Sequence, residues 1–157
     1  MKGPLMQRHS LASGKEAAAS ALAMLMAADG RVDEREILTL AALDAFRRLA
    51  VTRQRLLDLA NQSLDDTAAQ RCGRLWLSAA DRACLDKLLD AVPSQPERLL
   101  VCRLAAAVVT ADGRVTPDER LVYDHMLARW GVTQSMVTDA ILHDRRRYPC
   151  RARSPAQ

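Results

Sequence analysis

The sequence Ala-Asp-Gly-Arg-Val at residues 28–32 occurs again at residues 111–115, and this repeated stretch decides the fold. In each copy a glutamate follows the aspartate by seven positions, at Glu36 and Glu119. The flanking residues align at the same spacing, so the chain contains two copies of one unit. An Asp-Gly pair after an apolar segment is typical of a helix end, because glycine adopts positive φ without steric cost. The repeat therefore predicts a duplicated helix-loop-helix hairpin.

The composition favours a helical interior. Hydrophobic residues form 49% of the 157 residues, but aromatic residues form only 3%. Alanine, leucine, valine and methionine must therefore fill the core, and these residues suit closely packed helices better than a sheet. A chain of this length suits one domain with one core. We predict an all-α, single-domain bundle of seven or eight helices with an internal duplication.

Apolar spacing and helix breakers give the expected order of elements. Helices are expected at residues 15–28, 33–50, 52–61, a segment ending at Trp76, and residues 78–92, 99–110, 117–130 and 133–143. The helix over 33–50 should bury a stripe made of Leu38, Ala41, Ala42, Ala45 and Leu49. Residues 61–66 read as a turn, and residues 93–96 as a linker between the halves. Residues 48–52 align with 129–133, which indicates a two-residue deletion in the second copy.

These elements define the expected domain organisation. The helical domain covers residues 15–144, with the first repeat at about 16–62 and the second at about 99–143. Residues 1–14 form a lead-in, and residues 145–157 form a basic tail.

The net charge of +4 comes from the two ends of the chain. Residues 1–15 and 145–157 carry eight basic residues and no acid, so the remaining 15 basic residues face all 19 acidic ones. The tail can hold anionic lipid or nucleic acid, or can simply be solvated. Tyr148 is its only aromatic residue, which disfavours base stacking and hence nucleic acid. The candidate anion-binding residues are Arg145, Arg146, Arg147, Arg151 and Arg153.

The remaining reactive residues show no constellation typical of catalysis. Four cysteines lack the spacing of zinc sites, and Cys72, Cys84 and Cys102 are interpreted as small core residues. His125 and His143 have no partner histidine or cysteine at helical spacing, so packing or surface roles are favoured. We therefore expect no enzyme activity. Without an apolar leader or an apolar run long enough to span a bilayer, the expected location is cytoplasmic.

The repeated loop matches only the second half of an EF-hand calcium loop. Asp29 and Glu36 take its fifth and twelfth positions, whereas Leu25 and Ala27 stand at the first and third, where oxygen ligands belong. The second copy departs at the same two positions. A cation site would need donors from both loops together, or further donors from Asp33, Asp118, backbone carbonyls and water.

Helix capping is the alternative explanation of the glutamates. Residues 33–36 and 116–119 both have the pattern of a capping box, with an oxygen-bearing first residue and a glutamate three positions later. Acidic residues in the first turn also interact favourably with the helix dipole. Capping therefore accounts for Glu36 and Glu119 without a ligand. Asp29 and Asp112 precede the caps, so their repetition is less easily explained in this way.

With its two ADGRV loops, the glutamate after each and the Ala- and Leu-rich helices around them, the chain resembles the TerB-like proteins of bacterial tellurite-resistance operons. The resemblance covers about residues 15–144. It implies an all-helical fold, work near integral membrane partners, and a metal site where the loop acids cluster. These acids map onto Asp29, Glu36, Asp112 and Glu119. Thr116 and Pro117 replace the Asp33 and Glu34 of the first copy, so the second loop is poorer in donors.

From these observations we expect a non-enzymatic stress-response module related to tellurite resistance. It would bind a divalent cation, calcium or magnesium, or a partner protein, through the acidic face made by the two loops. The partner can be membrane-associated, which would place the protein at the inner membrane surface. The alternatives are a structural or adaptor bundle with no metal, and a membrane or nucleic-acid binder that acts through its basic tail.

Overall fold

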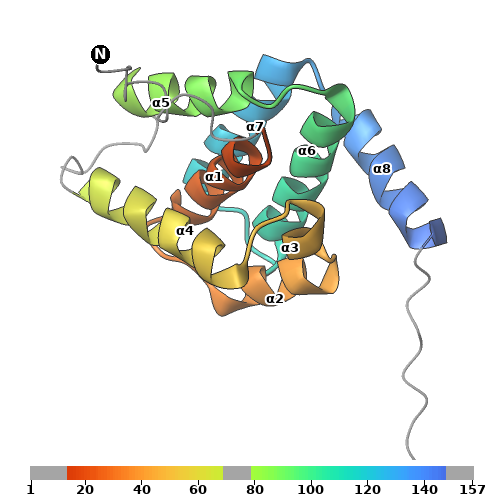
Figure 1. Cartoon of the computed structure of the whole chain (residues 1–157), viewed down its shortest axis with the longest axis horizontal. Helices are drawn as coiled ribbons and strands as arrows, with labels where there is room; N and C mark the ends of the chain where they lie inside the picture. The colour runs from red at the N-terminus through yellow and green to blue at the C-terminus, as the bar shows by residue number, and fades with distance from the viewer. Residues whose placement is uncertain (1–13, 69–78, 148–157) are drawn as a thin grey trace, which may run out of the picture.

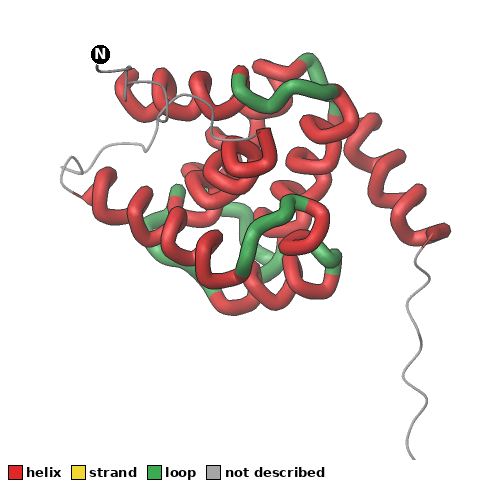
Figure 2. Tube along the Cα trace, viewed as in Figure 1, coloured by secondary structure: helices red, strands yellow, loops and turns green. Residues whose placement is uncertain are grey.

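The computed structural model describes residues 14–68 and 79–147, and every regular element in these ranges is an α-helix (Figures 1 and 2). The prediction of an all-α fold is thereby confirmed. The expected helical segment ending at Trp76 lies outside the described residues. The eight described helices are α1 (Gly14–Ala27), α2 (Glu34–Ala42), α3 (Ala45–Arg48), α4 (Arg53–Ala68), α5 (Ala79–Asp90), α6 (Gln95–Thr110), α7 (Pro117–Trp130) and α8 (Gln134–Arg147).

Helix α1 forms the centre of the bundle. Residues 17–19 and 21–28 are all buried, so the helix is enclosed on every side, as its apolar sequence predicts. Helices α4, α5, α6 and α7 pack around it (Figure 1). Six of the 14 residues of α1 are alanine, and a side chain this small lets neighbouring helices approach closely while favouring the helical state.

The expected helix over residues 33–50 is wrong in its middle. The chain leaves the helical conformation at Asp44, whose φ is 57°, so α2 and α3 are separate helices. Because the expected apolar stripe crossed this break, its first half is wrong as well. Ile37 and Leu40 face the core, whereas Leu38 is 55% exposed. Ala41 and Ala42 are exposed too, while Ala45 and Leu49 are buried as predicted.

The two helix-loop-helix units pack differently. Helices α6 and α7 contact each other as a hairpin, as predicted, whereas α2 packs mainly against α6 of the other repeat. In the first unit α1 and α2 make few contacts with each other, and both pack against α6 of the second unit. The contact between α2 and α6 brings the first repeat against the second.

Three helices are longer than their sequence patterns indicate. Residues 61–66 continue α4 and do not form the expected turn. Helix α6 begins within the expected linker, because Ser94 caps it and Pro96 lies in the first turn, where a missing N–H costs no hydrogen bond. Helix α8 runs to Arg147. The expected cap at Thr52 is confirmed, since its Oγ1 accepts a hydrogen bond from the Arg55 N–H at 3.1 Å.

The cysteines and histidines have mixed surroundings. Cys102 is buried as predicted, but Cys84 is exposed because it lies on the outer face of α5. Cys72 lies outside the described residues. His125 Nε2 lies 2.6 Å from Asp86 Oδ1 on α5, and His143 is exposed on α8. Among the described helices, none is long and apolar enough to cross a membrane. The cytoplasmic location stays a prediction.

The aligned segments 48–52 and 129–133 end their helices in the same way and allow a paired test of stability. Ala50 and Gly131 both have positive φ, 50° and 62°. The residue after each donates a backbone hydrogen bond five positions back, at 2.9 and 3.0 Å. Only glycine takes this conformation without strain. We therefore expect Ala50→Gly to stabilise the protein by about 0.5 to 1 kcal/mol and Gly131→Ala to destabilise it by about 1 kcal/mol.

Urea unfolding followed by far-UV circular dichroism measures both changes. A Cβ on Gly131 would meet no heavy atom within 4 Å, so any loss there reports backbone conformation and not a clash. Changes of similar size and opposite sign in the free energy of unfolding would support the same positive-φ helix end at both positions. Destabilisation by Ala50→Gly would contradict it.

Candidate functional site

The two Asp-Gly loops have the same internal geometry. Gly30 and Gly113 take positive φ values of 92° and 75°. Asp29 Oδ1 accepts a hydrogen bond from the Arg31 N–H at 3.1 Å, and Asp112 Oδ1 accepts one from the Arg114 N–H at 2.9 Å. Each aspartate therefore stabilises its own turn with one oxygen. Turn formation explains part of the repetition of this residue.

The glutamates form the predicted capping boxes. Glu36 Oε2 accepts from the Asp33 N–H at 3.2 Å, and Glu119 Oε2 accepts from the Thr116 N–H at the same distance. In return, Asp33 Oδ1 accepts from the Arg35 N–H at 2.8 Å and Thr116 Oγ1 from the Glu119 N–H at 3.3 Å. Both capping boxes are confirmed. Each glutamate again uses one of its two oxygens.

Burial separates these glutamates from ordinary capping residues. Glu36 is 3% exposed and Glu119 is 2% exposed, although glutamate is almost never fully buried unless it is paired. Within the described residues neither glutamate has a lysine, arginine or histidine at ion-pair distance. Burial raises the pKa of Glu36 to about 8 and also raises the pKa of Glu119. Glu36 therefore holds its proton near neutral pH.

The acids of the two repeats influence one another electrostatically. After burial, the groups that raise the pKa of Glu36 include Glu119 of the second repeat and Asp29 of its own loop. Asp29 and Asp112 likewise raise the pKa of Glu119. The charge of Asp29 therefore raises the pKa of both glutamates, and carboxyl groups of the two loops are close enough to interact. We call Asp29, Glu36, Asp112 and Glu119 the acidic cluster.

The other two predicted ligands lie at the edge of this cluster. Asp33 is the N-cap of α2 and also raises the pKa of Glu36, whereas Asp118 lies in the first turn of α7. Both side chains are partly buried. Over residues 14–68 and 79–147, no three His, Cys, Asp or Glu side chains are arranged as a preformed metal site.

The donor chemistry of the acidic cluster fits a hard divalent cation. Calcium and magnesium prefer carboxylate and carbonyl oxygens. Among the described residues, the hydrogen bonds of the cluster occupy one oxygen of each carboxyl group. The second oxygen of each would be the one to contact a cation, and that of Asp29 also lies 3.9 Å from Arg31 Nε. Four such oxygens are fewer than the six to eight that calcium takes, so water or backbone carbonyls would complete its shell. Magnesium, which keeps several waters, needs fewer protein ligands.

Exposed apolar side chains occur at matching positions of the two repeats. Leu38 and Leu121 each follow the buried glutamate by two residues, and they are 55% and 38% exposed. Val115, in the second loop, is 46% exposed. The sequence analysis placed Leu38 in the core and did not single out Leu121. Their equivalence in the repeat was the signal that could have identified them.

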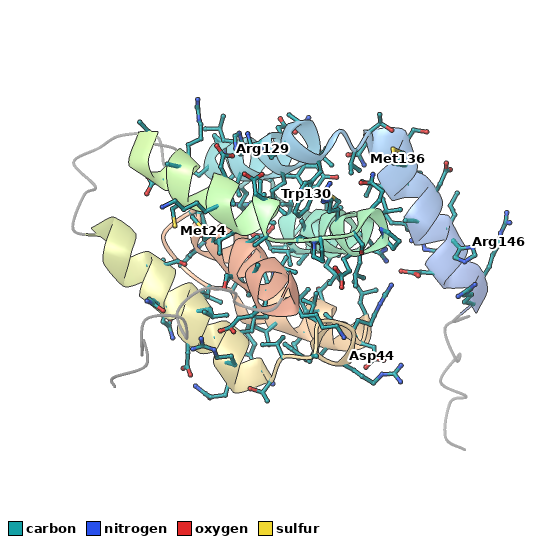
Figure 3. All side chains as sticks on the ribbon, turned by 45° about the horizontal axis from the view of Figure 1, so that its top comes forward. Met24, Asp44, Arg129, Trp130, Met136 and Arg146 are labelled. Atoms are coloured by element: carbon teal, nitrogen blue, oxygen red, sulfur yellow. The ribbon has the colours of Figure 1, made fainter. Side chains whose placement is uncertain are left out.

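The basic residues lie elsewhere. Arg145, Arg146 and Arg147 are exposed in the last turn of α8, where cationic side chains favour the helix C-terminus. Figure 3 shows Arg146 at the end of α8, pointing away from the bundle. Arg151 and Arg153 lie outside the described residues. Arg103, a buried arginine within the apolar helix α6, was not predicted as a functional residue, although it interrupts an apolar run of the sequence.

The fold and the repeated acidic loops define a duplicated helix-loop-helix protein of the all-α class. The family described as tellurite resistance protein TerB matches residues 15–140, and the chain belongs to this family. The match covers both Asp-Gly loops and ends within α8, before the three arginines. Comparison with curated proteins gives no significant match, and neither does comparison with solved structures.

Proposed function

We propose that the protein is a non-enzymatic module that binds a divalent cation, calcium or magnesium, through the acidic cluster. The observation that carries this proposal is the burial of Glu36 and Glu119 near Asp29, with neither glutamate at ion-pair distance from a cationic side chain among the described residues. Carboxyl groups held together in this way repel one another when ionised, and a divalent cation would relieve that repulsion.

The proposal assigns roles to particular residues. Asp29 and Asp112 would contribute ligand oxygens from the turns, while Glu36 and Glu119 would contribute the oxygens that capping leaves over. Asp33 and Asp118 would act at the edge, directly or through water. Because a ligating carboxylate must be deprotonated, cation binding near neutral pH would release the proton of Glu36.

A titration of the protein with Ca²⁺, Mg²⁺, Mn²⁺ and Zn²⁺ tests this proposal through backbone amide shifts. We expect Gly30, Val32, Gly113 and Val115 to shift together at millimolar calcium or magnesium, more strongly at pH 9 than at pH 6. The double variant Asp29→Asn, Asp112→Asn should lose these shifts, while its melting temperature without ions stays nearly unchanged because asparagine also supports such turns.

The matched control is Asp44→Asn with Asp124→Asn, two exposed aspartates away from the loops that each pair with an arginine. This variant should bind the cation like the unmodified chain. Loop amides that stay still in every titration would exclude the cation site.

A docking surface for a partner protein is the second candidate, and the exposed Leu38, Leu121 and Val115 favour it. Exposed apolar patches mark many protein interaction sites. Leu38→Ser with Leu121→Ser should weaken partner binding without loss of stability, since neither side chain is buried. Unchanged capture of a partner by this variant would exclude the surface. Tellurite-linked stress response and membrane-associated partners remain proposals of the same kind.

A further inference from the structure

A groove of about 540 Å³ lies between the first half of α6 and the outer helix α8, with Arg48 of α3 at its edge. It is separate from the acidic cluster, because α6 reaches the Asp112 loop only at its other end. Helix α8 stands beside α6 along this side of the bundle (Figure 1). Its apolar lining residues are Pro96, Leu99, Leu100, Met136 and Ala140.

Arg103 is the buried cation of this groove. The residue is 8% exposed, and its Nε donates no hydrogen bond to any residue that the structure describes. Its nearest acidic atom is Asp144 Oδ2, at 3.6 Å from Nε. A buried guanidinium with so distant a partner is costly, because desolvation is offset only by close, well-directed contacts.

The carboxylate near Arg103 is already shared with a second arginine. Arg48 donates to both oxygens of Asp144, with nitrogen to oxygen distances of 3.2 and 3.5 Å. Burial lowers the pKa of Arg103, the Asp144 charge opposes this change, and Arg48 and Arg145 add to it. The guanidinium nevertheless stays protonated at neutral pH. Two arginines of the groove, Arg48 and Arg103, thus share the carboxylate of Asp144.

Arg48, Arg103, Asp139 and Asp144 give the lining of the groove no net charge, which disfavours a ligand with more than one negative charge. Asp139 also lines the groove but is exposed at its rim. A doubly charged phosphate would meet repulsion from Asp139 and Asp144, whereas a carboxylate brings one charge and matches the planar donors of a guanidinium. The apolar walls beyond Arg103 suit a hydrocarbon chain. A volume of this size is within the range of small-molecule sites.

We propose that this groove binds a single-chain amphipathic carboxylate, whose head lies on Arg103 and whose tail lies along Leu99, Leu100 and Met136. Figure 3 shows Met136 on the first part of α8. The tail would extend from Arg103 toward this residue. The proposal does not depend on the function of the acidic cluster. It assigns a ligand to a site that neither the loop motif nor the basic tail predicts.

Decanoate is the probe, and the full chain labelled with ¹⁵N reports its binding. The amides of Leu99, Leu100, Arg103 and Ala140 should shift and saturate by about 5 mM decanoate, which corresponds to a dissociation constant in the millimolar range or below. Decanol lacks the charge and acetate lacks the tail. Each should bind at least about tenfold more weakly, because decanol loses the charge-assisted hydrogen bonds to Arg103 and acetate loses the apolar contacts.

Two variants and one control make the test specific. Arg103→Met keeps an apolar side chain of similar length and should weaken decanoate binding at least about tenfold. Ala140→Phe fills the groove while leaving Arg103 in place, and it should abolish binding. Arg120→Met removes an exposed arginine that pairs with Asp124 on α7, and it should bind like the unmodified chain.

Several outcomes would overturn the proposal. The proposal is wrong if the groove amides do not shift at 5 mM decanoate, or if Arg103→Met still binds decanoate as tightly as the unmodified chain. It is also wrong if decanol binds as tightly as decanoate, or if decyl phosphate binds more tightly. If Arg103→Met fails to fold, Ala140→Phe decides alone, because loss of decanoate shifts with an intact fold supports the groove and their persistence excludes it.

Discussion

Replacing Glu36 with glutamine is expected to remove most of the pH dependence of folding stability between pH 4.5 and about 8. The folded protein raises the pKa of Glu36 from 4.5 to about 8, first through burial and then through Glu119, Asp29 and Asp33. Over this range the folded state keeps the proton that the unfolded chain releases. The contribution of Glu36 to the free energy of unfolding is therefore largest below pH 4.5 and falls as the pH rises toward 8.

The size of this effect follows from linkage. A pKa difference of this magnitude corresponds to roughly 5 kcal/mol between the two ends of the pH range. Glutamine can still accept the Asp33 N–H, so the capping box of α2 is kept. Glu36→Gln should thus match the unmodified protein at pH 5 and exceed its stability by several kcal/mol at pH 9. Glu119, whose pKa is raised in the same direction, leaves a smaller residual slope.

Urea unfolding at a series of pH values, without divalent ions, measures this difference. Glu34→Gln provides the control, because Glu34 lies two residues earlier on α2 and is exposed. That variant should keep the full pH dependence. If Glu36→Gln and Glu34→Gln showed the same slope, Glu36 would not be the buried proton carrier.

The sequence was sufficient to predict Glu36 as a helix cap, but not as a buried acid. A capping box depends on four consecutive residues, so its spacing was sufficient to predict it. The burial of Glu36 depends on α2 packing against α6, which no local pattern specifies. The same long-range packing brings Glu119 and Asp29 close to it. The acids of the cluster were therefore predictable, but their mutual electrostatic effect was not.

The errors in the fold have equally local causes. Periodicity predicts a stripe only while a helix is continuous, and Asp44 in the left-handed region ends that continuity. In α2 the core face contains Ile37, which the expected stripe left out, and Leu38 is exposed. Arg103 shows the converse problem, because a charged residue within an apolar helix is usually assigned to an exposed face. Only the packing of α8 against α6 reveals that its guanidinium is buried.

Truncating Trp130 to alanine is expected to destabilise the protein by about 3 to 5 kcal/mol, the range for loss of a large buried aromatic side chain. Trp130 is 7% exposed and lies in the interior beside α5 (Figure 3). Its Nε1 donates a hydrogen bond to the Leu89 carbonyl at 2.9 Å. Leu89 is in the last turn of α5, where the residue four positions later is Pro93. Proline has no N–H, so the indole takes the place of the missing helical donor.

Trp130→Phe separates the hydrogen bond from the packing. Phenylalanine keeps most of the buried surface but cannot donate, so we expect a loss of about 1 to 2 kcal/mol. Far-UV circular dichroism during urea unfolding is the suitable measurement, because the substitution itself changes the fluorescence. If Trp130→Phe were as stable as the unmodified chain, the hydrogen bond from Val92 at 3.2 Å would satisfy the Leu89 carbonyl by itself. A loss confined to Trp130→Ala would then assign the role of Trp130 to packing alone, as for Leu49, its apolar equivalent in the first repeat.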